Sequence, residues 1–162
     1  MFGRLNPSVV QVGVLALWLG AAGLLSISVA PALFAVLPSR TLAGAVVGRI
    51  LPPVFFAGMT AGVLVLALQV VQGRGWSWGG REISGIVMIV ACSIAQLGIA
   101  PRIARLREEI AGPIEDLALN DVQRVAFGRL HGFSVACLGL AMIAAIVATV
   151  IAAHASSADA TG

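Results

Sequence analysis

The chain has 162 residues, of which 59% are hydrophobic and only 10% are charged. Soluble globular proteins contain about 45–50% apolar and about 25% charged residues, so this composition excludes a soluble enzyme and a disordered chain. The net charge is +3, every cation is an arginine, and no basic patch with interleaved aromatic residues points to nucleic acid.

The distribution of charge indicates how the chain is organised. Four stretches contain no Asp, Glu, Lys or Arg: 5–39, 50–73, 83–101 and 130–158. A helix of roughly 20 apolar residues spans a bilayer, so each stretch is long enough. We predict an all-α polytopic membrane protein, with one domain over residues 1–155 that forms a four-transmembrane-helix bundle. The predicted spans are 8–30, 50–72, 83–101 and 130–153. A disordered tail is predicted over 156–162.

The N-terminal stretch also has features of a signal peptide. Arg4 precedes a long apolar run, and Ser28, Val29 and Ala30 have the small-residue pattern of a cleavage site. Cleavage would fall before Pro31, which is unfavourable, and the run is long for a signal sequence. We therefore interpret it as a retained first span.

The first loop, residues 31–49, is itself largely apolar. Leu33 and Leu37 fall on one helical face, and Pro38 then interrupts the pattern. We predict an interfacial first loop, made of two short helices that lie in the plane of the membrane surface and break at Pro38.

The segment between the third and fourth spans, 102–129, has helical periodicity on both sides of Gly112. We predict an extramembrane helical hairpin with its tip near Gly112. Glu115 and Asp116 are expected in the first turn of its second helix, where the helix dipole favours acids. Pro101 is expected to kink the third helix.

Arginine counts predict the orientation. The loops 31–49 and 102–129 carry seven arginines, whereas the other side carries Arg4, Arg74 and Arg81. The positive-inside rule then places both arginine-rich loops in the cytoplasm and both termini outside a cell (inner) membrane. The arginines predicted to bind lipid headgroups are Arg40, Arg49, Arg102, Arg105, Arg107 and Arg129.

Candidates for chemistry are few, because no Asp, Glu, Lys or Arg lies within a predicted span. We predict no catalytic site and no cofactor. His131 and His154 are about 35 Å apart along one helix and cannot share a metal within one chain. His131 stays a candidate ligand, alone or with the soft thiols of Cys137 or Cys92, so a metal- or haem-binding component is an alternative.

Small residues predict close helix packing. Gly58 and Gly62 form a small-xxx-small motif in the second span, and such faces let helices approach closely in lipid. They serve either packing within one chain or a homodimer. Gln11 and Gln96 are expected to face the bundle interior and form hydrogen bonds there. The other small faces are Ala16 with Gly20, and Ala141, Ala145 and Thr149.

Three ordered stretches together resemble a known family: Trp18-Leu-Gly20 with Ala30 to Phe34, Ala43 to Phe56, and Ala100 to Ile103 leading to Phe127 to Ser134. The chain resembles the transmembrane-protein-205-like family, four-helix membrane proteins classed as a domain of unknown function. The resemblance implies four membrane helices and no established reaction. The residues that carry the family motif are Trp18, Gly20, Pro31, Phe34, Arg40, Gly44, Pro52, Phe55, Pro101, Arg102, Phe127, His131 and Ser134.

The tryptophan motif of the first span also resembles copper-resistance-type domains and a four-helix haem-binding family. Those families place a His shortly before the Trp, where this chain has Gln11 to Val14. We therefore interpret Trp18 as a packing residue.

The sequence thus predicts an integral membrane protein of unknown biochemical activity, with a structural, lipid-interacting or partner-binding role. Its expected partners are membrane lipids, with a homodimer through small-residue faces as a further option. A component accessory to small-molecule or metal tolerance is the other alternative.

Overall fold

The computed structural model describes residues 6–73, 78–110 and 112–161, with side chains as far as Ala155. Every regular element in these ranges is helical, which confirms the all-α prediction. Four helices are long and apolar enough to cross a membrane: Pro7–Val36, Arg40–Val71, Gly80–Glu109 and Val122–Ala155.

The first and third membrane helices are each built from three segments. The first joins α1 (Pro7–Leu24), the π-helix η1 (Leu25–Val29) and α2 (Ala30–Val36). The third joins α4 (Gly80–Ser93), the π-helix η2 (Ile94–Ile99) and α5 (Ala100–Glu109).

Each π segment ends just before a proline, Pro31 or Pro101. A proline inside an α-helix removes one hydrogen bond and clashes with the preceding turn. The wider π turn relieves the clash, because the Ala30 N–H bonds to the Leu25 carbonyl and the Ala100 N–H bonds to the Ala95 carbonyl, five residues back. Pro101, where a kink of the third helix was expected, is therefore accommodated by the π segment η2.

The prediction of an interfacial first loop is wrong. Helix α2 continues the first membrane helix, and α3 (Arg40–Val71) begins directly after a short turn that contains Pro38. The helix continues past Pro31 because η1 accommodates that proline. Ser39 then starts α3, since its Oγ accepts a hydrogen bond from the Leu42 N–H at 3.1 Å. Only the break at Pro38 lies where it was expected.

The hairpin between the third and fourth membrane helices is present, with a different second arm. Glu115 and Asp116 lie in a short 3₁₀ turn, η3 (Ile114–Asp116), and not at the start of the second helix. Helix α6 (Val122–Thr161) begins later, because Asp121 Oδ1 caps it by accepting from the Gln123 and Arg124 N–H groups at 2.8 and 3.2 Å. The α6 backbone also continues through the expected disordered tail to Thr161, in line with the high helix propensity of the alanines there.

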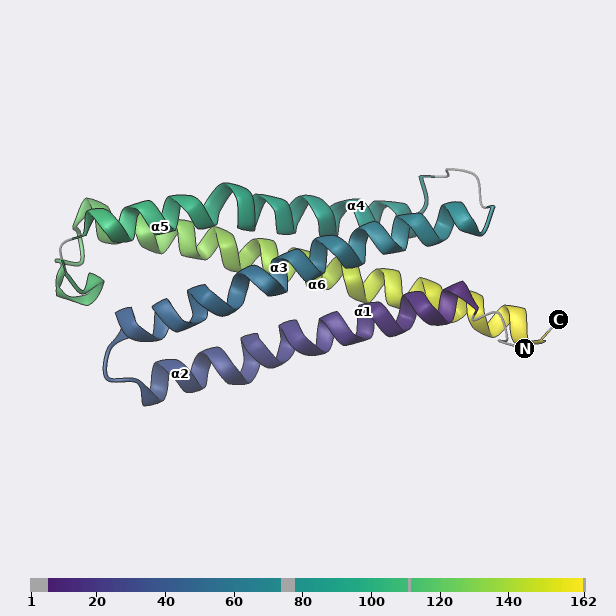
Figure 1. Ribbon diagram of the computed structural model, residues 1–162, viewed down its shortest axis with the longest axis horizontal. Coiled ribbons are helices and arrows are strands. Elements are labelled where there is room, and N and C mark those ends of the chain that lie inside the picture. The colour runs from purple at the N-terminus through teal and green to yellow at the C-terminus, as the bar shows by residue number, and fades with distance from the viewer. Residues whose placement is uncertain (1–5, 74–77, 111, 162) are drawn as a thin grey trace.

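The four membrane helices form an antiparallel bundle (Figure 1). Helices α1 and α4 each pack against both α3 and α6. The two ends of the chain lie at one end of the bundle, and the hairpin and the turn after α2 lie at the other, which we call the hairpin end. Towards the hairpin end, α2 and the start of α3 diverge from α5 and α6.

The middle of the bundle is closed by small residues. A Cβ atom on Gly58 would lie 2.7 Å from Cys92 Sγ and 2.9 Å from the Trp18 ring, and one on Gly62 would lie 2.9 Å from the Gly85 carbonyl oxygen. The small-xxx-small motif therefore packs within one chain. The core residues around it include Leu15, Trp18, Phe55, Met88, Cys92 and Leu138.

Candidate functional site

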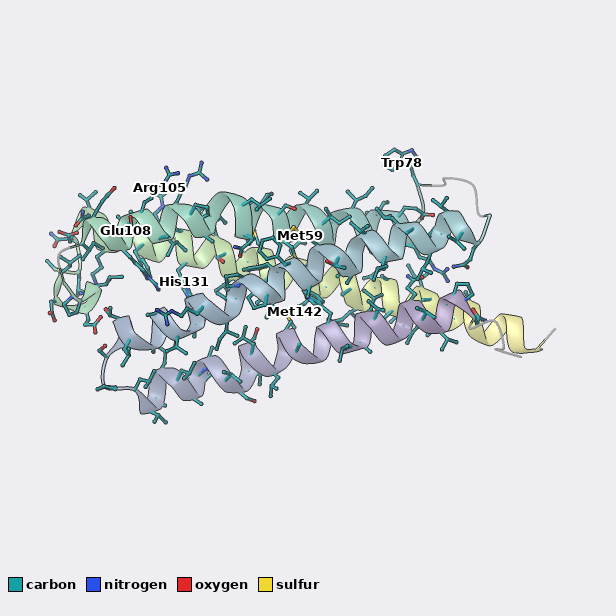
Figure 2. All side chains as sticks on the ribbon, viewed as in Figure 1. Met59, Trp78, Arg105, Glu108, His131 and Met142 are labelled. Atoms are coloured by element: carbon teal, nitrogen blue, oxygen red, sulfur yellow. The ribbon has the colours of Figure 1, made fainter. Side chains whose placement is uncertain are left out.

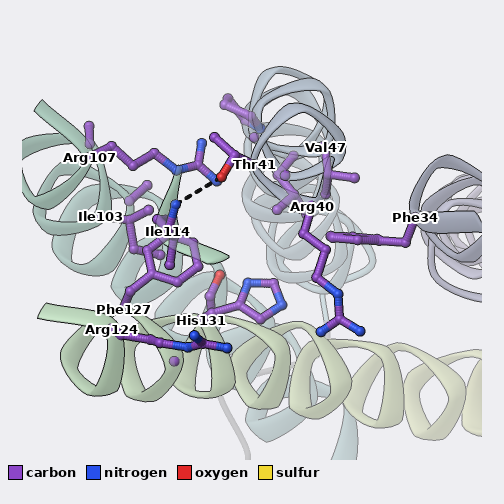
Figure 3. A pocket seen from close by; sticks show the side chains of 18 of the residues that line it. Phe34, Arg40, Thr41, Val47, Ile103, Arg107, Ile114, Arg124, Phe127 and His131 are labelled. Carbon is purple, nitrogen blue, oxygen red and sulfur yellow. Dashed lines mark hydrogen bonds between the residues drawn. The ribbon is translucent and has the colours of Figure 1, made fainter. Parts of the chain in front are cut away.

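A cavity of about 400 Å³ opens at the hairpin end, between α2, α3, α5 and α6 (Figure 3). Its apolar wall includes Phe34, Val47, Leu51, Pro52, Phe55 and Ile103. Its polar side chains are Arg40, Thr41, Gln96, Arg107, Glu115, Arg124, His131 and Ser134. The cavity is therefore apolar along its wall and rich in cations.

Arg107 reaches from α5 to the opposite wall. Its Nη2 lies 3.0 Å from where a Cβ on Gly44 would be, and its Nη1 lies 3.2 Å from the same position on Gly48. Its Cζ lies 5.3 Å from the centre of the Phe127 ring, a cation–π distance. The guanidinium group is held between glycine backbone and an aromatic face, and makes no ion pair with any described residue.

His131 follows Phe127 by one helical turn on α6. The two rings are stacked, with centres 6.3 Å apart and planes inclined by 1°. Figure 3 shows the imidazole beside the cavity, near Arg40. Cys92 lies instead in the core against Gly58, and no group of three or more His, Cys, Asp or Glu residues that could hold a metal occurs in the part of the chain that the structure describes.

The hairpin is held to the start of α3 by Thr41 and Glu115. The Thr41 hydroxyl donates to Glu115 Oε2, and the Ile114 N–H donates to the Thr41 Oγ1 at 3.1 Å. The Thr41 hydroxyl bond lowers the pKa of the Glu115 carboxyl below its ordinary value, as do backbone N–H groups at the start of α3. Arg124 fixes the same turn by donating to the Glu115 carbonyl at 3.2 Å and to the Leu117 carbonyl. We call these contacts the hairpin latch.

The opposite end of the bundle contains buried polar residues that the sequence reading left unassigned. They are Ser8, Gln69, Arg81, Glu82 and Ser84, which are buried as Gln11 is. Arg81 Nη2 donates to the Ile151 carbonyl at 2.9 Å, so this arginine ties α4 to α6. A signal was available in the sequence, because Arg81 and Glu82 directly precede the apolar run.

Both glutamines predicted to face the interior do so. Gln11 is 1% exposed, and Gln96 lines the cavity. The predicted hydrogen bonds are not formed by Gln11 Nε2, Gln11 Oε1 or Gln96 Oε1. The glutamines thus leave unsatisfied polar atoms at both ends of the bundle.

The residues that carry the family motif divide into two groups. Those brought together around the cavity are Phe34, Arg40, Gly44, Pro52, Phe55, Phe127, His131 and Ser134. Trp18 lies in the core, where its Nε1 donates to the Val54 carbonyl at 2.9 Å. Gly20, Pro31, Pro101 and Arg102 lie on exposed helix surfaces. No sequence pattern indicated Thr41 or Arg124 as site residues, and only the spacing of Gly44 and Gly48 indicated that another group approaches α3 closely there.

The predicted headgroup arginines gather at the hairpin end. Arg40, Arg49, Arg102, Arg105 and Arg129 are exposed, and Arg107 is half-buried in the cavity. Figure 2 shows Arg105 pointing away from the bundle, whereas His131, also exposed, lines the cavity.

Comparison with known proteins identifies a family and nothing further. The family described as Domain of unknown function (DUF4149) matches residues 13–111. This range runs from α1 to just beyond α5, so it includes the α3 and α5 sides of the cavity. No curated protein matches the chain, and no solved structure does.

Proposed function

The chain belongs to the DUF4149 family, for which no function is known, and from the arrangement of its charges we propose that it is a lipid-interacting integral membrane protein. Its arginine-rich hairpin end would hold anionic lipid headgroups. The observation that carries this proposal is the gathering of exposed arginines at that end, on helices whose apolar stretches 50–73, 83–101 and 130–158 contain no charged residue.

The physical basis is electrostatic. A cation near an anionic membrane surface gains about 1 kcal/mol, and long arginine side chains at a helix end can reach the headgroup layer. Arg102 extends back along its own helix and donates to the Gly98 carbonyl at 2.8 Å. The other exposed arginines of this end are available to phosphate groups.

The same distribution supports an orientation. The positive-inside rule favours the hairpin end in the cytoplasm and both termini outside a cell (inner) membrane. The resemblance to the transmembrane-protein-205-like family supports the same four-helix arrangement. Ala16 and Gly20 are exposed on α1, so they leave a small-residue face for a homodimer within this proposal.

Lipid retention tests the function directly. We expect native mass spectrometry of the full chain, released from detergent with equal phosphatidylglycerol and phosphatidylcholine, to show preferential retention of phosphatidylglycerol. The triple variant Arg102→Gln, Arg105→Gln, Arg129→Gln should reduce this preference. The matched control is Arg4→Gln with Arg74→Gln, which removes arginines predicted on the other side. Equal retention of both lipids by the parent protein would refute the proposal.

A further inference from the structure

We propose that the cavity at the hairpin end is a specific site for one anionic phospholipid, whose phosphate is bound by Arg107 and Arg40. This inference rests on the proposed function and deepens it. It distinguishes binding in one cavity from the general attraction of exposed arginines to the membrane surface.

The size of the cavity fits a ligand of this kind. Ligand pockets commonly have volumes of about 300–1,000 Å³, are mostly apolar, and carry a few well-placed polar groups. The volume here is about 400 Å³, with Val47, Leu51 and Phe55 on the apolar wall. Free inorganic phosphate would leave this apolar wall uncovered, whereas a phospholipid would cover it.

The charge inside the cavity favours an anion. A cation withdrawn from water is costly unless a counter-charge pairs with it. Arg107 is half-buried, and Glu115 is the only acid among the described lining residues. Glu115 is engaged by Thr41 in the hairpin latch. The guanidinium of Arg107 therefore lacks an anionic partner that a lipid phosphate would supply.

The position of Arg107 is set before any ligand binds. Gly44 and Gly48 leave room for its guanidinium, and the Phe127 ring lies against it. An arginine held in this way loses less side-chain entropy when it binds a phosphate, for which its planar donor fork is well suited. Arg40 extends from α3 on the other side of the cavity, beside His131 and Phe34 (Figure 3).

A path for the acyl chain is present next to Arg40. Phe34 lines the cavity and is 44% exposed, and its ring extends from α2 towards Arg40 (Figure 3). It therefore lies at an open edge of the cavity. The apolar portion of a phospholipid can extend along this ring while its phosphate stays between the two arginines.

The test compares two arginines on the same helix. We expect native mass spectrometry of the full chain, titrated with phosphatidylglycerol, to show one lipid that binds more tightly than the rest. Arg107→Gln should weaken that first binding step about tenfold or more, because a charge-assisted pair is lost. Arg105→Gln removes an exposed charge two residues away and should change it less than about twofold. Arg40→Gln, also at an exposed position, serves as the second cavity variant in case Arg107→Gln does not fold.

The outcomes separate this inference from the proposed function. Equal weakening by the Arg105 and Arg107 variants, with the anionic preference intact, would overturn the cavity site and leave the proposed function standing. If the parent protein shows no preference for phosphatidylglycerol, both the cavity site and the proposed function are overturned. Inorganic phosphate is the third probe: we expect it not to displace the first lipid, and efficient displacement would overturn a phospholipid as the occupant.

Discussion

Helix α3 carries two glycine pairs with the same spacing, and the bundle uses them in opposite ways. Gly58 and Gly62 lie against Cys92, Trp18 and neighbouring backbone, so they allow helices to touch. Gly44 and Gly48 meet only the tip of Arg107, so they make room for a cation. A small-xxx-small motif therefore determines how closely another group can approach, while the facing helix determines whether that group is a helix backbone or a functional side chain.

The largest expected effect is a loss of stability when the Gly58 and Gly62 pair is altered, with no such loss for the Gly44 and Gly48 pair. Gly58→Ala adds a methyl group where Cys92 and Trp18 leave no space, and overpacking of this kind costs about 1–3 kcal/mol. We expect the thermal midpoint in detergent to fall by several degrees. The matched control is Gly48→Ala, because the Arg107 side chain can move away and alanine favours a helix by about 1 kcal/mol over glycine. A similar loss in both variants would contradict the distinction.

The next largest effect is expected at the end of the bundle opposite the hairpin end, where Gln11 lies buried. Both polar atoms of its amide lack partners, and an unsatisfied buried group carries a cost of about 1–3 kcal/mol. Gln11→Leu should therefore raise the thermal midpoint. Gln72→Leu is the control, since it removes a hydrogen bond to the Leu68 carbonyl and should give no gain. A decrease for Gln11→Leu would mean that the amide has a partner in the membrane.

A smaller loss is expected at Trp18, which joins α1 to the Gly58 region. Trp18→Phe keeps most of the ring and removes the hydrogen bond from Nε1 to the Val54 carbonyl. Such a bond contributes about 0.5–1.5 kcal/mol, so the midpoint should fall less than for Gly58→Ala. An unchanged midpoint would show that ring packing alone accounts for this contact.

The smallest effect concerns the hairpin latch at the hairpin end. The pKa of Glu115 is lowered in the folded protein, mainly by the Thr41 hydroxyl. Its contribution is therefore complete above the unfolded pKa of a glutamate and is lost as the pH falls through the lower folded pKa. The protection of the amide hydrogens of residues 112–121, measured as the exchange rate relative to the intrinsic rate at the same pH, should thus fall only in acid. Thr41→Val should raise the Glu115 pKa and accelerate exchange slightly at neutral pH, whereas Asp116→Asn, at an exposed position, should not.

The membrane helices could be predicted because their signal is local. A run without charges, such as 83–101, specifies a span by composition alone. Their ends could not be predicted in the same way. Arg81 and Glu82 appeared to belong to a loop, yet they are buried at the start of α4, where Arg81 reaches the Ile151 carbonyl. The residues around a charged side chain in the sequence do not show that its partner lies on another helix.

The residues of the candidate site also differ in whether the sequence could predict them. The family resemblance singled out Phe34, Gly44 and His131, and these residues do line one cavity. The pairing of Thr41 with Glu115 was not predictable, because 74 positions separate them and neither forms part of a periodic pattern. The cavity itself depends on how far α3 and α5 diverge, which is a property of packing and not of any single motif.

The π segment η2 sets the angular phase of everything that follows it. A π turn holds one residue more than an α turn, and one residue corresponds to about 100° of rotation around a helix. An α-helix of the same length over Ile94–Ile99 would therefore turn α5 by about that angle and move Arg107 away from Gly44 and Gly48. The π segment instead absorbs one residue between Cys92 and Arg107 and keeps the cation directed into the cavity. Deleting one residue within the π segment would return it to an α-helix and leave this direction unchanged, whereas inserting a further residue would redirect it.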